Sequence, residues 1–186
     1  MINKKFLIII IVIAVVAALA SVLILLAANS NNIVIDVSSA TSKIESVLPP
    51  RSEGTAEKRY NSEMPVMNID GNDFIGLIEV PERNVKLPVY SKWNEKAVRI
   101  VPCRYSGSIY DLNLIIGGTE MNGGFEFLTS LEKGETVTFT EMTGKEYTFK
   151  VDSVFHRDDF EINNEGDLIL FSYMNDVSKY IFIKCK

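Results

Sequence analysis

Asp167-Leu-Ile-Leu-Phe-Ser-Tyr173 is the most informative segment of this chain. It is a short apolar run that follows a polar segment and ends in a tyrosine, which is typical of a buried β-strand. The final stretch, Lys179-Tyr-Ile-Phe-Ile-Lys-Cys185, has a similar character. Because successive side chains point to opposite faces of a strand, Ile181 and Cys185 are expected on the core face and Tyr180 on the other face.

Similar short runs extend upstream and predict an all-β domain. In two of them apolar and polar residues alternate, which is the period of a half-buried strand, and Met142–Lys145 between them contains a glycine and predicts a hairpin loop. A helical turn is expected over Trp93–Arg99. Seven or eight short strands with little helix indicate a closed or nearly closed barrel. The predicted strands are residues 74–80, 86–90, 112–118, 135–141, 145–152, 167–173 and 179–185.

The N-terminal region predicts a membrane anchor. Residues 6–27 contain no charge, and 22 residues exceed the roughly 20 that a helix needs to cross a bilayer. A cleavable signal peptide is the alternative, since small residues occur near Ala20 and Ala28, but its apolar region is only about 7–15 residues long. Lysines in residues 1–5 favour a cytoplasmic N-terminus. The sequence therefore predicts a single-pass protein of the cell membrane whose C-terminal domain is extracellular.

Residues 28–71 are rich in Ser, Asn, Glu and Pro and predict an extracytoplasmic tether. A weak apolar pattern that reaches Ile44 and Leu48 is compatible with a short helix, which Pro49 would end. The compact domain is expected to occupy residues 72–186.

Charge excludes one class of partner. The chain has 19 basic and 24 acidic residues, and without Lys4 and Lys5 the exported part has a formal charge of −7. Nucleic-acid binding needs clustered basic residues, so no nucleic-acid partner is expected. The acidic run Asp158–Asp167 lacks the spacing of a calcium loop, and Gly117-Gly118 lacks that of a phosphate-binding loop. We therefore predict no cofactor and no metal site.

Two cysteines, Cys103 and Cys185, and one histidine, His156, complete the reactive residues. An extracytoplasmic location permits a disulfide between the cysteines. The sequence leaves open whether they form this disulfide or are two buried free thiols.

The order of motifs along residues 73–186 resembles that of the sortase family. Sortases are membrane-anchored transpeptidases that join sorting-signal proteins to the cell wall or to pilins. The resemblance implies an eight-stranded β-barrel with short helices, preceded by one N-terminal transmembrane helix. The motifs that carry it are Ile75-Gly-Leu-Ile-Glu-Val-Pro81, Leu87-Pro-Val-Tyr90, Pro102-Cys-Arg-Tyr-Ser-Gly-Ser108, Leu114-Ile-Ile-Gly-Gly-Thr119, Phe127-Leu-Thr-Ser-Leu131, Gly134-Glu-Thr-Val137 and Leu168-Ile-Leu-Phe171.

The resemblance also implies that the family's catalytic residues are missing. Sortases use a cysteine as nucleophile, a histidine for proton transfer and an arginine that stabilises the oxyanion. The matching positions here are Thr119 for the histidine, Tyr173 for the cysteine and Tyr180 for the arginine, with Lys179 as the alternative for the last. Threonine cannot transfer protons near neutral pH, and the tyrosine hydroxyl is mostly protonated there.

Beside these positions, the residues predicted to line the former active-site groove are Glu120, Met121, Ser172 and Lys179. We therefore expect a sortase-like protein without catalysis that binds a sorting-signal peptide, a pilin or another sortase and acts as a scaffold in cell-envelope or pilus assembly. One alternative is an active transpeptidase or peptidase with displaced residues, such as Cys103 with His156. Another is an exported sensor or adhesion module.

Overall fold

The computed structural model describes residues 13–21, 33–54, 63–120, 124–162, 166–174 and 177–186. Met1–Ile33 and Val34–Lys186 are separate compact units, and each is considered by itself. The cytoplasmic segment and most of the membrane span predicted over residues 6–27 lie outside the described residues. Residues 13–21 are helical. Within the described ranges no helix is long and apolar enough to cross a bilayer.

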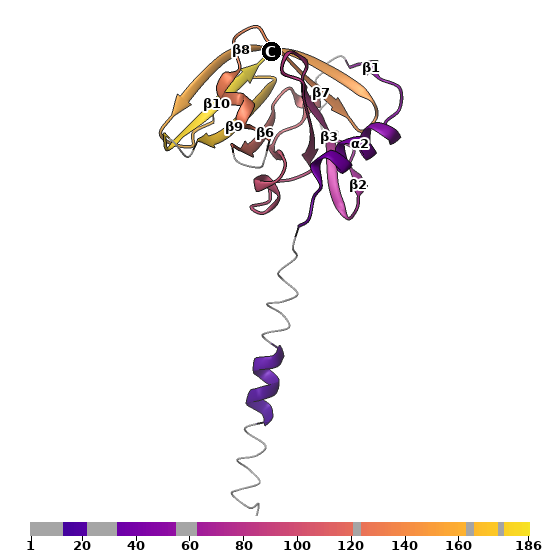
Figure 1. The fold of residues 1–186 in the computed structure, drawn as a ribbon, viewed down its shortest axis with the longest axis vertical. Coiled ribbons are helices and arrows are strands. Elements are labelled where there is room, and N and C mark those ends of the chain that lie inside the picture. Colours follow the sequence, from indigo (N-terminus) through magenta and orange to yellow (C-terminus); the bar gives the residue numbers. More distant parts are fainter. Residues whose placement is uncertain (1–12, 22–32, 55–62, 121–123, 163–165, 175–176) are drawn as a thin grey trace, which may run out of the picture. The chain divides into compact units, whose positions relative to one another are not determined.

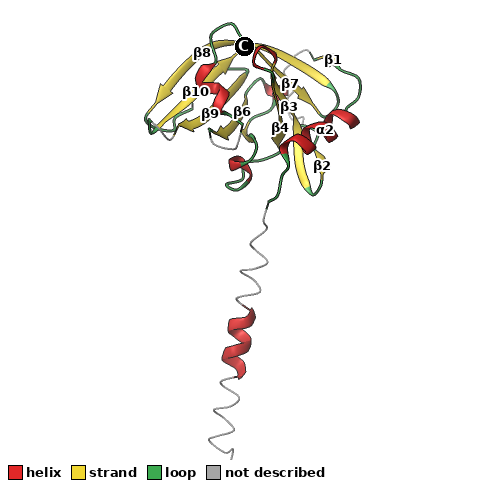
Figure 2. Ribbon diagram, in the orientation of Figure 1, coloured by secondary structure: helices red, strands yellow, loops and turns green. Residues whose placement is uncertain are grey.

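The second unit is a closed β-barrel (Figures 1 and 2). Strands β3 to β10 pair in the ring order β8-β10-β9-β6-β5-β4-β3-β7, and β7 closes the ring by pairing with both β3 and β8. The predicted eight-stranded barrel is thereby confirmed. The β4–β5 and β6–β9 pairs are parallel, and the other pairs of the ring are antiparallel. The strands are β1 (Ser52–Glu53), β2 (Met67–Ile69), β3 (Asn72–Val80), β4 (Val85–Tyr90), β5 (Cys103–Ser106), β6 (Leu114–Thr119), β7 (Thr136–Glu141), β8 (Lys145–Arg157), β9 (Leu168–Met174) and β10 (Lys179–Cys185), and the helices are α2 (Val37–Val47) and the 3-10 turns η1 (Pro81–Arg83), η2 (Ala97–Arg99), η3 (Ile109–Asp111) and η4 (Glu126–Ser130).

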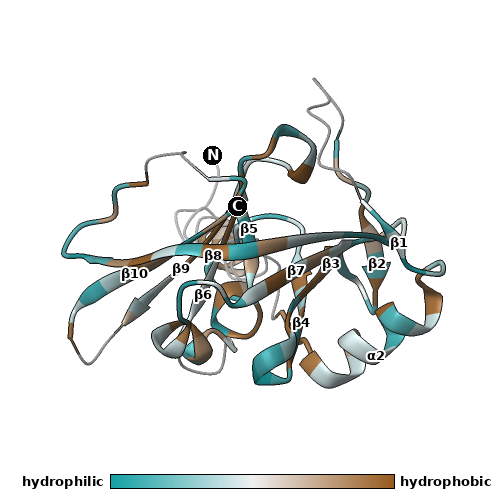
Figure 3. Cartoon of the chain, turned by 90° about the horizontal axis from the view of Figure 1, so that it is seen from above, coloured by the Kyte–Doolittle hydropathy of each residue, from teal (hydrophilic) through white to brown (hydrophobic). Residues whose placement is uncertain are grey.

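The β7–β8 hairpin shows how the sequence pattern builds the barrel. Val137 and Phe139 pair with Phe149 and Tyr147, and all four side chains are buried in the interior core. The colours of Figure 3 show apolar and polar residues alternating along β8. Gly144 in the connecting turn has φ +80°, a conformation that glycine adopts without steric cost. The predicted hairpin is therefore present.

Strands β9 and β10 are apolar on both faces. Ile181 and Cys185 belong to the interior core, as the alternation predicts. Phe171 and Phe182 face the other way and form a second apolar cluster with residues of neighbouring strands. This outward cluster is the base on which the site described below is built.

The described residues between 34 and 71 belong to the folded unit. The predicted helix is present as α2. It begins after Asp36, whose carboxylate accepts a hydrogen bond from the Ser39 backbone N–H at 2.9 Å, and it ends at Leu48, before Pro49. Ile44 on this helix is fully buried. An amphipathic face thus attaches a mostly polar segment to the barrel.

One arginine and one lysine side chain strengthen this attachment. Arg51 donates hydrogen bonds to Glu79 at 2.6 Å and Glu146 at 2.7 Å. Lys86 donates to Glu45 of α2 at 2.5 Å. In addition β1 pairs with β8, and β2 forms a hairpin with β3 across a turn at residues 70–71. The expected boundary at residue 72 cuts through this hairpin, and the compact unit begins at Val34.

Other boundaries differ for local reasons. Strand β5 was not predicted, because Cys103–Ser106 is short and mostly polar. Strand β6 begins at Leu114 rather than 112, since Leu112 has φ +53° and lies in a turn. The predicted helical turn over 93–99 is limited to η2.

Candidate functional site

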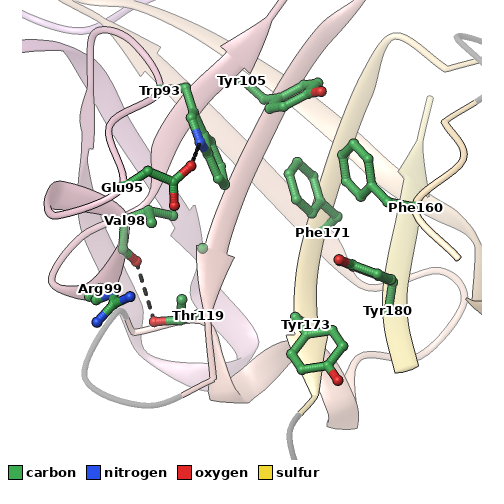
Figure 4. A pocket seen from close by; sticks show the side chains of 11 residues that line it. Trp93, Glu95, Val98, Arg99, Tyr105, Thr119, Phe160, Phe171, Tyr173 and Tyr180 are labelled. Carbon is green, nitrogen blue, oxygen red and sulfur yellow. Dashed lines mark hydrogen bonds between the residues drawn. The ribbon is translucent and has the colours of Figure 1, made fainter. Parts of the chain in front are cut away.

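A pocket of about 610 Å³ lies on the outward face of β6, β9 and β10 (Figure 4). The loop before β5 and the segment after β8 complete its walls. Its volume falls in the range of roughly 300–1,000 Å³ that is usual for ligand sites. The lining residues are Trp93, Glu95, Val98, Arg99, Tyr105, Gly118, Thr119, Phe160, Phe171, Tyr173 and Tyr180.

One wall of the pocket is a row of hydroxyl-bearing residues on three adjacent strands. Thr119 of β6 pairs in register with Tyr173 of β9, and Tyr173 pairs with Tyr180 of β10. The two tyrosine rings have centroids 5.0 Å apart. Thr119 Oγ1 donates a hydrogen bond to the carbonyl oxygen of Val98 at 3.3 Å. The three positions singled out in the sequence are therefore neighbours around one pocket.

The next row on the same face consists of Gly117, Phe171 and Phe182. A Cβ atom on Gly117 would lie 2.3 Å from the Phe171 ring and 2.7 Å from the Trp93 ring. The missing side chain lets the indole lie nearly parallel to Phe171, with centroids 5.8 Å apart and planes at 20°. A glycine at this position therefore makes room for the aromatic floor of the pocket.

Two further rings extend the aromatic surface. Tyr105 lies edge-on to Trp93 at 5.3 Å, and Phe160 lies 5.0 Å from Phe171 and 5.2 Å from Tyr180. Tyr105 is 42% exposed and Phe160 is 37% exposed, so both rings are accessible to a ligand. The pocket can bury an apolar or aromatic group.

The charged groups of the pocket are Glu95 and Arg99. Glu95 Oε1 accepts a hydrogen bond from Trp93 Nε1–H at 2.7 Å, at the aromatic end. Arg99 ends η2, is exposed, and lies beside Thr119 in Figure 4. Among the described residues it forms no hydrogen bond or ion pair. Among the residues that the structure describes, no group of three or more His, Cys, Asp or Glu side chains could hold a metal ion.

Comparisons with family models and with curated proteins find no match. Solved structures do match. Sortase C1 from Streptococcus agalactiae has a TM-score of 0.55 at 20% identity, covering 63% of this chain and 69% of that one. Sortase A from Corynebacterium diphtheriae has a TM-score of 0.52 at 15% identity, and the match covers 61% of this chain and 60% of that one. A sortase D5 transpeptidase from Clostridium perfringens has a TM-score of 0.51 at 16% identity, and the match covers 62% of this chain and 79% of that one. This chain has the sortase fold.

The structure places three of the four predicted groove residues of this sortase-fold domain. Ser172 is buried and lies on the interior side of β9, because it alternates with Phe171 and Tyr173. Lys179 pairs with Asp158 at 3.2 Å and is not in the pocket lining. Glu120 is half-buried and also outside the lining, and Met121 lies outside the described residues. None of the three groove candidates that can be placed is therefore among the residues that line this pocket.

The two thiols of the sortase-fold domain are free and buried. The paired strands place Cys103 in one row with Gly117, Phe171 and Phe182, three strands from β10, which carries Cys185. Three strand spacings are roughly 14 Å, well beyond the roughly 4–7 Å Cα separation of a disulfide. The possible disulfide is therefore wrong, and the alternative of two buried thiols is correct. Burial raises the pKa of each thiol to about 12.

The displaced pair Cys103 and His156 is not assembled either. His156 is an exposed residue of β8 whose register partner is Ile181 of β10. Neither side chain lines the pocket of the sortase-fold domain.

The aromatic walls of the pocket and Arg99 were not predicted from the sequence. One signal was present, since aromatic residues recur at alternate positions 171 and 173 and again at 180 and 182. That spacing places all four on the outward face of the strands. Trp93 and Phe160 come from loops and Arg99 from the short turn η2, and a single sequence does not indicate where these segments lie against the strands.

Proposed function

We propose that this chain is a membrane-anchored, extracytoplasmic protein that binds a peptide segment in the pocket without cleaving it, as a scaffold in cell-envelope or pilus assembly. The row Thr119, Tyr173 and Tyr180 is the observation that carries the proposal. It occupies adjacent strands at a pocket of suitable size, and it contains neither a thiol nor an imidazole.

The chemistry of that row favours binding over acyl transfer. A thioester intermediate needs a thiolate in contact with the substrate and a group that transfers a proton. The hydroxyls of this row can donate and accept hydrogen bonds to a peptide backbone instead. With the accessible rings of Tyr105 and Phe160 they form a surface suited to an extended peptide that carries apolar side chains.

The alternative of an active enzyme with displaced residues has less support. Both cysteines are buried, and burial raises the pKa of each thiol to about 12, so the thiolate form that acts as a nucleophile is disfavoured at neutral pH. The chain's single histidine, His156, is on β8, outside the pocket lining.

A peptide that resembles a sorting signal and carries a thiol-reactive end tests the proposal. Trp93 is the only tryptophan and lines the pocket, so its emission reports occupancy directly. We expect the full chain in nonionic detergent to show a saturable change in Trp93 emission and no increase in intact mass. An adduct on Cys103 or Cys185 would establish the enzyme instead.

Two variants control the binding signal. Phe160→Ala removes a ring of the pocket and should weaken binding about tenfold or more, as expected for truncation of an aromatic anchor. Val177→Ala changes an exposed apolar residue outside the lining and should leave binding unchanged. Equal affinities for the two variants would place the peptide elsewhere on the molecule.

A further inference from the structure

The outward face of β3, β7 and β8 is covered, although it lies outside the interior core. Leu77 of β3 pairs with Thr140 of β7, and Thr140 pairs with Glu146 of β8. Their neighbours Ile78 and Phe139 belong to the interior core, so strand alternation turns Leu77, Thr140 and Glu146 outward. Leu77 and Thr140 are nevertheless fully buried. Another segment of the folded unit therefore lies over this face.

Residues 49–54, which we call the arm, cross this face after α2 ends. Arg51 donates hydrogen bonds to Glu79 of β3 at 2.6 Å and to Glu146 of β8 at 2.7 Å. Because β7 lies between β3 and β8, the guanidinium spans β7 on its outward side. The arm then pairs in parallel with β8 through the hydrogen bond from the Gly54 N–H to the Glu146 carbonyl oxygen at 2.8 Å.

The arm is held by polar contacts. Its residues from Pro49 to Glu53 are exposed and Gly54 is half-buried, so the arm buries no side chain of its own. Pro49 and Pro50 have no backbone N–H to donate. Release of the arm would therefore cost hydrogen bonds and exposed ion pairs, for which water substitutes at a small net free energy. Helix α2, with the buried Ile44, can stay in place.

The face beneath the arm has binding capacity that the arm does not use in full. Thr140 Oγ1 is buried and has no hydrogen-bond partner among the described residues, whereas buried hydroxyls normally have one. Glu79 and Glu146 contribute two negative charges, and Lys86, at 3.2 Å from Glu79, offsets one of them. Without Arg51 the face would therefore have a carboxylate in excess and an unsatisfied hydroxyl.

We infer that this face is a second binding site, to which an extended segment of a partner protein binds through an arginine and replaces the arm. Strand β8 has an edge for such a segment at residues 144–146, because β10 pairs with β8 only further along, over 151–157. The segment adds a strand to this edge, as in β-augmentation. Its arginine lies between Glu79 and Glu146, and its backbone supplies an acceptor for Thr140.

In this arrangement the arm is a competitor within the same chain. The site lies on β3, β7 and β8, whereas the pocket lies on β6, β9 and β10, so the inference does not depend on the proposed function. The apparent affinity for the segment is reduced in proportion to the fraction of molecules in which the arm is released. A change that loosens the arm and leaves the acidic pair intact should therefore strengthen binding.

Two labelled peptides test the inference by fluorescence anisotropy with the full chain in nonionic detergent. One is Leu-Pro-Pro-Arg-Ser-Glu-Gly, the sequence of residues 48–54, and the other has Gln in place of Arg. Arg51→Gln removes the ion pairs of an exposed arm residue and leaves both carboxylates. We expect the Arg peptide to bind this variant about three- to tenfold more tightly than the unmodified chain. The Gln peptide should bind the variant more weakly than the Arg peptide by a similar factor.

Three further variants locate the peptide. Lys43→Gln removes the same charge from α2, where Lys43 pairs with Asp70 outside the arm, and should bind the Arg peptide as the unmodified chain does. Glu146→Gln, added to Arg51→Gln, should weaken binding of the Arg peptide. Phe160→Ala changes the pocket and, added to Arg51→Gln, should leave this binding unchanged.

The outcomes decide between the arm as competitor and simpler explanations. Equal affinity of the Arg peptide for the unmodified chain and for Arg51→Gln, or an equal gain in Lys43→Gln, would overturn the inference. Equal binding of the Arg and Gln peptides to Arg51→Gln would overturn the role of the acidic pair. A loss of binding caused by Phe160→Ala would place the peptide in the pocket instead. Absence of binding to Arg51→Gln up to millimolar concentration would exclude this second site, while the pocket is tested separately through Trp93 emission.

Discussion

Gly117 is the residue on which the aromatic floor depends. Replacement by alanine would place a methyl group 2.3 Å from Phe171 and 2.7 Å from Trp93. Both rings would have to move, and overpacking of this kind typically costs about 1–3 kcal/mol. We expect Gly117→Ala to lower the free energy of unfolding in urea by about that amount and to shift the Trp93 emission of the folded state.

Gly166→Ala is the control for this substitution. The nearest atom to its added methyl group is a side-chain carbon of Ile169 at 3.2 Å, which can give way. Its effect on stability should be clearly smaller. Equal destabilisation by the two substitutions would contradict the role assigned to Gly117.

The buried thiols predict a pH dependence. Burial raises the thiol pKa from an ordinary value of 9.0 to about 12, so the folded state binds the protons more tightly than the unfolded state. The stability that this provides is complete below pH 9 and is lost as the pH rises from about 9 towards 12. We expect the free energy of unfolding to fall more steeply over this range in the unmodified chain than in Cys103→Ala, as measured by urea titration at several pH values.

For individual residues, the sequence was informative where the alternation of a strand decides which face a side chain occupies. It placed Tyr180 on the pocket side and Ile181 in the core, and both placements hold. It failed for Ser172 because the same alternation, applied to β9, turns that residue inward. Arg99 could not be found, because its position depends on how the turn η2 packs against β6.

Helix α2 is the element whose contribution is easiest to measure. Ile44 is fully buried, whereas Val47 on the same helix is 53% exposed. We expect Ile44→Ala to lower the free energy of unfolding by about 2–4 kcal/mol and Val47→Ala to change it by less than about 0.5 kcal/mol. If urea unfolding shows equal effects, α2 does not pack on the barrel in solution.

The elements show what a single sequence can and cannot reveal. Regular alternation and a glycine-containing turn made the β7–β8 hairpin predictable. The β2–β3 hairpin was missed because Met67–Ile69 is only three residues long and sits in a polar stretch. The strand β2 forms because its backbone pairs with β3, and the sequence of β2 alone does not indicate this pairing.

The whole folded unit predicts where the chain can be shortened. The fragment 34–186 retains α2, β1 and β2, whereas 72–186 lacks the buried Ile44 and the bridge from Arg51 to Glu79 and Glu146. We expect the longer fragment to unfold in one cooperative transition, with circular dichroism and Trp93 emission coincident. The shorter one should have a lower midpoint temperature by several degrees or fail to fold. Equal midpoints would show that residues 34–71 are dispensable.

The outward row of Thr119, Tyr173 and Tyr180 has a consequence for how such a molecule can evolve. The strand positions that build the core point inward, so substitutions in the row leave the core packing unchanged. Selection on the packing of the interior core therefore acts only weakly on these three residues. The chemistry of this outward face could therefore change by a few point mutations while the interior core stays intact.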